Sequence, residues 1–341
     1  MTELGFAAAV NAALDVALAA DPNVFLLGED IADPGGGVYK VTKGLSSKYG
    51  LDRVRDTPIS ESAIIGAATG AALAGKRPVA EIMIMDFLGV CLDQLANHAA
   101  KLRYMTGGQV HVPLVVRMSA GAGVQFGAQH SEYLESWLAH TPGLKVVIPS
   151  TPAAAKGLLL SAIFDDDPVV FVEPTLLYFG GAKEEVPDGD VRIPLGQAAV
   201  AREGADITLI SYGIHVHTCL AAARQLAEHG VSAEVLDLRT IVPLDTATLF
   251  ASVAKTRRAV VVHEAVGRSG FGAELSSLIH EELFDELAAP VWRITGANTP
   301  VPYAKPLETA FLPSAEKITD AARMLCGEVA AVSTPGVARA T

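Results

Sequence analysis

Short runs rich in β-branched residues alternate with Ala- and Leu-rich stretches along almost the entire chain. Strand-length segments separated by helix-length segments are typical of a parallel sheet covered by helices. The expected strands are residues 24–27, 79–85, 114–118, 145–148, 169–172, 207–211, 233–238, 259–262 and 291–294. The expected helices are residues 6–19, 59–74, 88–104, 151–164, 216–228, 271–283 and 314–325. The alternation therefore predicts an α/β fold with parallel sheets.

A polar, turn-rich segment divides the 341 residues into two apolar parts. Residues 183–194 combine four acidic residues with two prolines and one glycine, a composition typical of a linker. A chain of this length is long for one compact core, so two domains are expected. We predict a first domain at residues 1–185, a second at 196–328, and a flexible tail at 329–341.

Composition narrows the classes of partner. The net charge of −12 argues against nucleic acid, because phosphate binding needs clusters of Lys and Arg. Mean hydropathy is high, at +0.34, yet no apolar run reaches the ~18 residues needed to cross a bilayer. We therefore expect no membrane span, and we expect the surplus apolar surface to be buried against other subunits.

The cysteines and the N-terminus bear on the compartment. Cys91, Cys219 and Cys326 are odd in number and widely spaced, which fits neither a disulfide framework nor a metal site. Residues 1–5 lack the basic start of a signal peptide, so a cytoplasmic location is expected.

Distinctive polar residues of the first half gather at one predicted edge of the sheet. They follow the expected strands, at residues 28–30, 86–87, 119–130, 149–151 and 173–174. Open α/β sheets bind ligands at the carboxyl ends of their parallel strands. This edge is therefore the predicted site.

The stretch from Asp56 to Ser62 predicts a helix start. Thr57 can cap a helix and Pro58 can occupy its first position. Glu61 then stands at the mouth of a helix built almost entirely of Ala, Ile and Gly. On spacing alone, Glu61 is more often a partner of the helix dipole than a group with chemistry to perform.

A glycine-rich loop at residues 121–131 leads toward a second predicted helix. Ser131 is a candidate cap, with Glu132 and Glu135 in the opening turns. His130 would then stand at a helix start, where the dipole favours neutral imidazole, suited to moving protons near pH 7. The alternative is a histidine that only packs or caps.

Three further motifs are ambiguous on sequence alone. Phe87 is either a core aromatic or a stacking platform for a flat ring. Asp165, Asp166 and Asp167 are either a solvated charge run or a cation site of oxygen ligands. Residues 267–272 lack the lysine of a phosphate loop and fail the spacing of the dinucleotide fingerprint, so they favour a tight strand-to-helix turn.

Several stretches together resemble a known family, the beta subunits of the thiamine-diphosphate-dependent component of 2-oxo acid and acetoin dehydrogenase complexes. The matching stretches are residues 28–30, 36–45, 56–61, 128–131, 142–147, 155–158 and 234–239. The resemblance runs in order from about residue 4 to 326. It implies a two-domain transketolase-like fold, with a pyrimidine-binding domain and a C-terminal transketolase-type domain.

The resemblance also implies partners. Family members form an α2β2 heterotetramer, in which the alpha chain supplies a Gly-Asp-Gly motif for Mg²⁺ and the diphosphate. Here Gly189-Asp190 is followed by Val191, so this chain is expected to hold the pyrimidine end alone. The acyl group formed from a small-molecule substrate would pass to a lipoyl acyltransferase core.

Site residues carry over by position. The resemblance implies that Glu61 hydrogen-bonds a ring nitrogen of the aminopyrimidine, and that Phe87 packs on this ring beside Ile59 and Met83. It implies that His130 handles protons and guides acyl transfer to the lipoyl group. Members usually carry Gln where this chain has Glu132, a carboxylate that would raise the pKa of His130 against the helix dipole.

A structural potassium site of some members also has counterparts here. The matching residues are Leu114, Ala162, Ile163, Asp165 and Asp167. Asp167 replaces a frequent Asn.

Substrate and competing functions stay open at this stage. Residues 84–94 and 103–108 look closer to acetoin-cleaving members, whereas the short loop after Asp30 does not; acetoin is favoured over pyruvate and branched-chain 2-oxo acids. A non-catalytic scaffold or regulatory subunit is disfavoured by the joint presence of Glu61, Phe87 and His130. A self-sufficient transketolase-like enzyme is disfavoured by the missing diphosphate motif.

Overall fold

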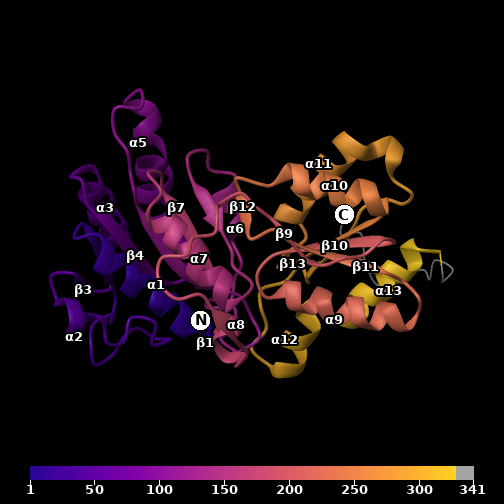
Figure 1. Ribbon diagram of the computed structural model, residues 1–341, viewed down its shortest axis with the longest axis horizontal. Helices are drawn as coiled ribbons and strands as arrows, with labels where there is room; N and C mark the ends of the chain where they lie inside the picture. Colours follow the sequence, from indigo (N-terminus) through magenta and orange to yellow (C-terminus); the bar gives the residue numbers. More distant parts are fainter. Residues whose placement is uncertain (328–341) are drawn as a thin grey trace.

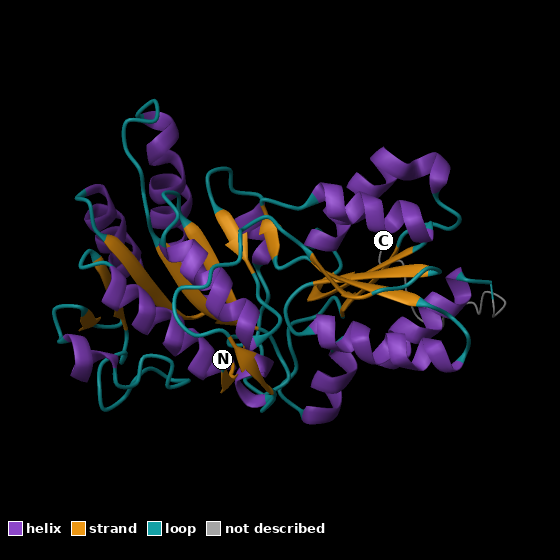
Figure 2. Ribbon diagram, viewed as in Figure 1, coloured by secondary structure: helices purple, strands orange, loops and turns teal. Residues whose placement is uncertain are grey.

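The structure, a computed structural model, describes residues 1–327. It consists of two α/β halves that lie side by side (Figure 1). The tail predicted at 329–341 lies outside the described residues. Figure 2 shows that strands form the centre of each half and helices cover both faces. The predicted α/β fold is confirmed.

The first sheet has seven strands in the order β12-β6-β7-β5-β4-β2-β3. Its strands are β2 (Val24–Gly28), β3 (Val54–Asp56), β4 (Arg77–Ile84), β5 (Val115–Ala120), β6 (Lys145–Val147), β7 (Val169–Pro174) and β12 (Thr240–Val242). All neighbours pair in parallel except β12, which runs antiparallel to β6. The carboxyl ends of the parallel strands consequently share one edge, as the sequence predicts.

Successive residues of these strands point to opposite faces, and each face buries a different helix group. Val79 of β4 packs with α1 (Phe6–Ala20) and α7 (Pro152–Ile163). Ala80 and Ile82 pack with α3 (Glu61–Leu73) and α4 (Leu88–Leu92). The predicted helix 88–104 continues from α4 through a π-helical segment, η2 (Asp93–Ala99), into α5 (Ala100–Met105).

The second sheet has five strands in the order β14-β13-β10-β11-β9. They are β9 (Ala199–Arg202), β10 (Ile207–Ser211), β11 (Ala233–Asp237), β13 (Ala259–Val266) and β14 (Trp292–Gly296). Helices α9 (His215–Glu228) and α13 (Ala315–Leu325) cover one face. Helices α10 (Thr246–Thr256) and α11 (Phe271–Leu283) cover the other.

The two halves are joined in two ways. One hydrophobic cluster runs through both, from Met118 of strand β5 in the first sheet to Tyr212 and Leu249 in the second half. Strand β12 leaves the second half to pair with β6.

The segment predicted as a polar linker begins as a strand, β8 (Lys183–Val186), which pairs antiparallel with β1 (Thr2–Gly5).

Short elements account for most of what the sequence pattern missed. They are β1, β3, β8, β9, β12, α2 (Leu45–Tyr49), α6 (Glu135–Ala139), α8 (Thr175–Phe179), α12 (Lys305–Phe311) and the 3-10 turns η1 (Met85–Phe87) and η3 (Phe284–Glu286). Helix α10 was missed as well, although Asp245 caps it by accepting the Thr248 N–H. Within residues 1–327, no helix is long and apolar enough to cross a membrane.

Candidate active site

Helix α3 begins at Glu61, not at the predicted Thr57-Pro58. The Thr57 N–H donates to the Gly28 carbonyl at 2.9 Å, which ties this residue to the end of β2 before the helix can start. Ser60 takes the N-cap position without a side-chain cap bond. The predicted cap and first position are therefore wrong, and Glu61 becomes the first helical residue at the edge of the sheet.

Glu61 is buried at 8 % exposure. Within residues 1–327, no side chain or backbone group donates a hydrogen bond to its carboxyl group. Its charge acts on its neighbours instead: burial raises the pKa of the Cys91 thiol to about 12, and Glu61 adds to that rise. The fully buried side-chain atoms without a partner include Glu29 Oε1 but neither carboxylate oxygen of Glu61. The Glu61 oxygens therefore reach the open edge of the site, where a bound molecule can donate a hydrogen bond to them.

Glu29 is a second buried carboxyl group here, which the sequence pattern placed at a strand end without giving it a role. Burial raises the pKa of Glu29, the charge of Glu61 raises it further, and a hydrogen bond from the Ser60 backbone opposes the rise. Its Oε1 atom has no hydrogen-bond partner. The end of β2 and the start of α3 thus bring two carboxyl groups together.

Phe87 and His130 meet although 43 positions separate them (130 − 87). Phe87 ends the 3-10 turn η1 that follows β4. Its ring centroid lies 5.5 Å from that of His130, with the ring planes at 82°. The structure therefore brings together two of the residues that the resemblance assigns to one site, one half-buried and one exposed.

Ile59 and Met83 differ in exposure. Ile59 lies two residues before Glu61 and is 83 % exposed. Met83 is half-buried in β4, and its carbonyl accepts a hydrogen bond from Ser119 Oγ at 2.8 Å. An isoleucine this exposed beside a buried carboxyl group offers apolar surface to whatever covers the site.

The helix predicted at Ser131 does not form there. Residues 131–134 are irregular, and α6 begins at Glu135. The Asp86 carboxylate instead accepts the N–H groups of Ser131, at 3.3 Å, and Glu132, at 3.2 Å. His130 is therefore not at a helix N-terminus, and the predicted effect of a helix dipole on it is wrong.

Asp86 is itself perturbed by this position. Burial raises its pKa, whereas the hydrogen bonds from Glu132 and Ser131 and the nearby His130 lower it. Burial and the charge of Asp86 likewise raise the pKa of Glu132. The sequence singled out Phe87 in this pair, but Asp86 is the residue that fastens the chain next to His130.

The residues that match a potassium site form hydrogen bonds and ion pairs with three basic side chains, those of Lys145, Arg103 and Arg77. Lys145 Nζ lies 2.7 Å from both carboxylate oxygens of Asp165, and Arg103 Nη1 lies 2.5 Å from Asp167 Oδ1. Arg77 donates to the carbonyls of Ile163, at 3.3 Å, and Asp165, at 2.9 Å. The carboxylates of Asp165 and Asp167 are thus paired within the chain, and Arg77 already donates to two of the main-chain carbonyl oxygens at this position.

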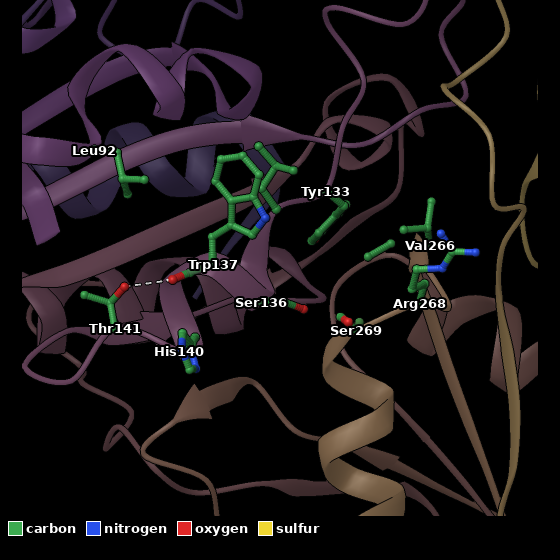
Figure 3. Close-up of a pocket in the computed structure, with 12 residues that line it drawn as sticks. Leu92, Tyr133, Ser136, Trp137, His140, Thr141, Val266, Arg268 and Ser269 are labelled. Carbon is green, nitrogen blue, oxygen red and sulfur yellow. Dashed lines mark hydrogen bonds between the residues drawn. The ribbon is translucent and has the colours of Figure 1, made fainter.

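A separate cavity of about 620 Å³ lies between the two halves. Figure 3 shows Tyr133 and Trp137 on one side of it and Val266, Arg268 and Ser269 on the other. Residues 267–270 form the turn from β13 to α11, so the predicted strand-to-helix turn is confirmed. None of the predicted site residues lines this cavity.

Comparison with known proteins gives two domain matches. Residues 2–180 match the transketolase pyrimidine-binding domain. Residues 196–318 match the transketolase C-terminal domain.

Full-length relatives carry two different names. The chain is 47 % identical over 330 residues to the beta subunit of acetoin:2,6-dichlorophenolindophenol oxidoreductase from Cupriavidus necator, covering 94 % of this chain and 97 % of the relative. It is 48 % identical over 323 residues to the mitochondrial pyruvate dehydrogenase E1 component subunit beta of Drosophila melanogaster, covering 94 % of this chain and 88 % of the relative.

A solved structure shares the fold. It is a split-gene transketolase, described as an inactive beta4 tetramer, with a TM-score of 0.76, 22 % identity, and coverage of 95 % of this chain and 98 % of that one.

Proposed function

The chain belongs to the beta subunits of the thiamine-diphosphate-dependent E1 components of acetoin and pyruvate dehydrogenases, and from this membership we propose that it forms half of a shared coenzyme site. The observation that carries the proposal is Glu61, a residue only 8 % exposed whose carboxylate receives no hydrogen bond from residues 1–327 and is open to a ligand. A ring nitrogen of the aminopyrimidine supplies the missing partner.

When bound, thiamine diphosphate supplies a carbon nucleophile and an electron sink for cleavage next to a carbonyl group. Glu61 shares a proton with the pyrimidine ring nitrogen. Sharing is efficient in a dry site, because water would compete for the carboxyl group and stabilise its charge. The Ala- and Ile-rich start of α3 provides that dry wall.

Phe87 and His130 have separate tasks in this proposal. Phe87 packs against the flat ring, beside Met83 and the exposed Ile59. His130, in edge contact with Phe87, holds or delivers a proton when the acyl group leaves for its acceptor.

The other half of the site must come from a partner. The names of the relatives as beta subunits imply an alpha subunit. We propose an α2β2 assembly in which the alpha chain binds Mg²⁺ and the diphosphate, and a lipoyl acyltransferase core accepts the acyl group. Ile59, which is 83 % exposed, supports this proposal because a facing chain would cover it.

We propose acetoin as the substrate. Overall identity does not separate the candidates, at 47 % for an acetoin relative and 48 % for a pyruvate relative. What supports acetoin is charge: Glu29, Glu61 and Asp86 place three carboxyl groups around the site, although burial raises the pKa of Glu29 and of Asp86 and so favours their neutral forms. Each carboxyl group that is ionised repels an anionic 2-oxo acid but not neutral acetoin, so pyruvate or a branched-chain 2-oxo acid would need a compensating cation from the alpha chain.

Three subsidiary proposals complete this assignment. The pyrimidine-binding domain spans residues 1–185 and the C-terminal domain spans residues 196–328. The protein acts in the cytoplasm. A potassium ion is held by the carbonyl oxygens of Leu114, Ala162, Ile163, Asp165 and Asp167. The Asp165 and Asp167 side chains are paired with Lys145 and Arg103, which favours main-chain ligands; the carbonyls of Ile163 and Asp165 would use the lone pair that Arg77 does not occupy.

Calorimetry with thiamine diphosphate and Mg²⁺ tests the half-site. We expect binding only after the alpha chain is added, and tight binding to the isolated chain would contradict the proposal. The co-expressed pair is then assayed with acetoin, pyruvate and branched-chain 2-oxo acids side by side. A higher kcat/KM for pyruvate than for acetoin would overturn the substrate assignment.

A further inference from the structure

The loop that ends in His130 is held by carboxylates from the other half of the molecule. The loop begins at Gly121, directly after β5. Glu264 of β13 accepts the Ala122 N–H at 2.5 Å. Glu308 of α12 accepts two more N–H groups through one oxygen, Gly123 at 2.7 Å and Gln125 at 2.9 Å.

These contacts lie at the buried interface between the two halves, called the seam below. Glu264 and Glu308 are 3 % and 1 % exposed, and bonds from N–H donors to buried carboxylates are among the stronger hydrogen bonds in proteins. Gly121 has a φ of +107°, and a Cβ there would lie 2.9 Å from Glu264 Oε1. The glycine is therefore what lets the carboxylate reach the loop.

Ala122 adds an apolar anchor at the same end. It packs in a small cluster with Val301 and Phe311 of the second half. At the other end of the loop, Asp86 binds the N–H groups of Ser131 and Glu132. His130 thus lies between two fixed points, one supplied by each half of the molecule.

The distance along the chain decides how closely His130 is held. With all contacts in place, residues 126–130 span the gap between the fixed N–H groups of Gln125 and Ser131. Without Glu308, the N–H groups of Gly123 and Gln125 lose their acceptor. The Ala122 bond to Glu264 then remains, with a 3.3 Å bond from Lys305 Nζ to the Gly123 carbonyl and the contact of the Phe126 ring with Phe179. The backbone of residues 123–130 is therefore held at fewer points. A segment held at fewer points admits more conformations, which weakens the placement of His130 beside Phe87.

We propose that Glu308, with Glu264, is a positioning residue for His130: the C-terminal half holds the loop so that the imidazole stays in contact with Phe87. The inference rests on the proposed role of His130 in acyl transfer. It assigns a catalytic consequence to a half of the chain that contributes none of the predicted coenzyme-binding residues.

The test uses the assembled enzyme with its alpha chain and compares two half-reactions. Cleavage is followed with 2,6-dichlorophenolindophenol as the electron acceptor, and transfer is followed with a lipoyl domain. Glu308→Ala is expected to slow transfer about tenfold to 100-fold, and cleavage by less than about threefold. Glu308→Gln, which keeps the accepting oxygen, is expected to restore transfer.

Asp245→Ala is the matched control. Asp245 also accepts two backbone N–H groups in the second half, from Ala198 and Thr248, each at 3.0 Å, but it does not contact the loop. It should lose thermal stability without changing the ratio of transfer to cleavage. Equal loss in both half-reactions for Glu308→Ala would overturn the proposal, because that is the signature of general destabilisation.

Coupling to His130 completes the test. In a His130→Ala background, adding Glu308→Ala should cause no further loss of transfer, whereas an independent, multiplicative loss would contradict positioning through His130. If His130→Ala alone leaves transfer intact, the proposed role of His130 fails. Amide hydrogen exchange of the peptide spanning residues 121–130 then still tests the anchor, and unchanged protection in Glu308→Ala would refute it.

Discussion

The acidic residues to which the resemblance assigns ligands, Glu61 on one side and Asp165 and Asp167 on the other, have opposite surroundings. Glu61 is buried, and none of residues 1–327 donates a hydrogen bond to it. Asp165 and Asp167 are partly exposed and are paired with Lys145 and Arg103 at 2.7 and 2.5 Å. The first arrangement is open to another molecule, whereas the second is complete within the chain.

The difference shows what separates a binding group from a structural one. A carboxyl group whose oxygens no neighbouring residue uses can accept a hydrogen bond from a ligand, and such a bond is stronger where little water reaches it. A partly exposed, internally paired carboxylate gains little from a ligand, because its oxygens are already used. Three experiments can break or sharpen this contrast.

The largest effect is expected at Glu61. Glu61→Gln should reduce exchange of the thiazolium C–H of bound coenzyme by roughly 100-fold or more, because an amide cannot share a proton as a carboxyl group does. Exchange is measured by NMR on the assembled enzyme. Assembly with the alpha chain and thermal stability should stay unchanged.

Glu316→Gln is the control for the alternative role of Glu61 as a partner of the helix dipole. Glu316 is likewise in the first turn of a helix, α13. If Glu61→Gln and Glu316→Gln leave exchange equally intact, Glu61 is a dipole partner and the contrast with Asp165 disappears.

His130 should give the next largest effect. His130→Ala is expected to reduce acyl transfer to a lipoyl domain by about tenfold to 100-fold and to leave cleavage of the substrate much less affected. The reason is the position of His130. It is exposed, contacts Phe87, and lies at the end of a loop rather than beneath the pyrimidine ring of the coenzyme. Rapid-mixing assays of each half-reaction make the comparison, and a matching loss in both would contradict the separation of tasks.

The smallest effect is expected in the paired cluster. Asp165→Asn should lower the free energy of unfolding by about 1 kcal/mol, because it weakens a pair whose side chains remain partly exposed to water. Urea denaturation measures this loss. The turnover number should not change, and a large fall in turnover would show that the cluster belongs to the reaction.

Potassium provides the companion measurement for the same variant. If the ion is held by main-chain carbonyls, exchanging choline chloride for potassium chloride should raise the melting temperature of the wild type and of Asp165→Asn equally. A potassium response that vanishes in Asp165→Asn would assign the ion to the side chain.

The local order of the chain was readable from the sequence where apolar periodicity is long. All nine expected strands are present, because short runs rich in β-branched residues, such as 207–211, favour strands and are buried on both faces. Short elements such as α6 and β12 were missed, since three to five residues carry too little periodicity. Long-range contacts fix them, as when β12 pairs with β6.

The same limit explains the two wrong helix starts. Thr57 and Ser131 both have side chains that commonly cap helices, so the local pattern favoured helices there. The Gly28 carbonyl takes the Thr57 N–H, and Asp86 takes the Ser131 N–H. Groups distant in the sequence compete for the same backbone donors, and no local pattern records them.

The sequence by itself determined the α/β architecture, the family, and the identity of Glu61, Phe87 and His130 as the residues to examine. Periodicity and motif spacing are properties of neighbouring residues, so they survive without the fold. The tertiary structure alone decided which carboxyl groups are satisfied: Asp165 meets Lys145, Glu61 meets no donor among the described residues, and Glu308 reaches across the seam to the loop of His130. Pairing depends on what lies within about 3 Å in space, and that distance is set by the whole fold.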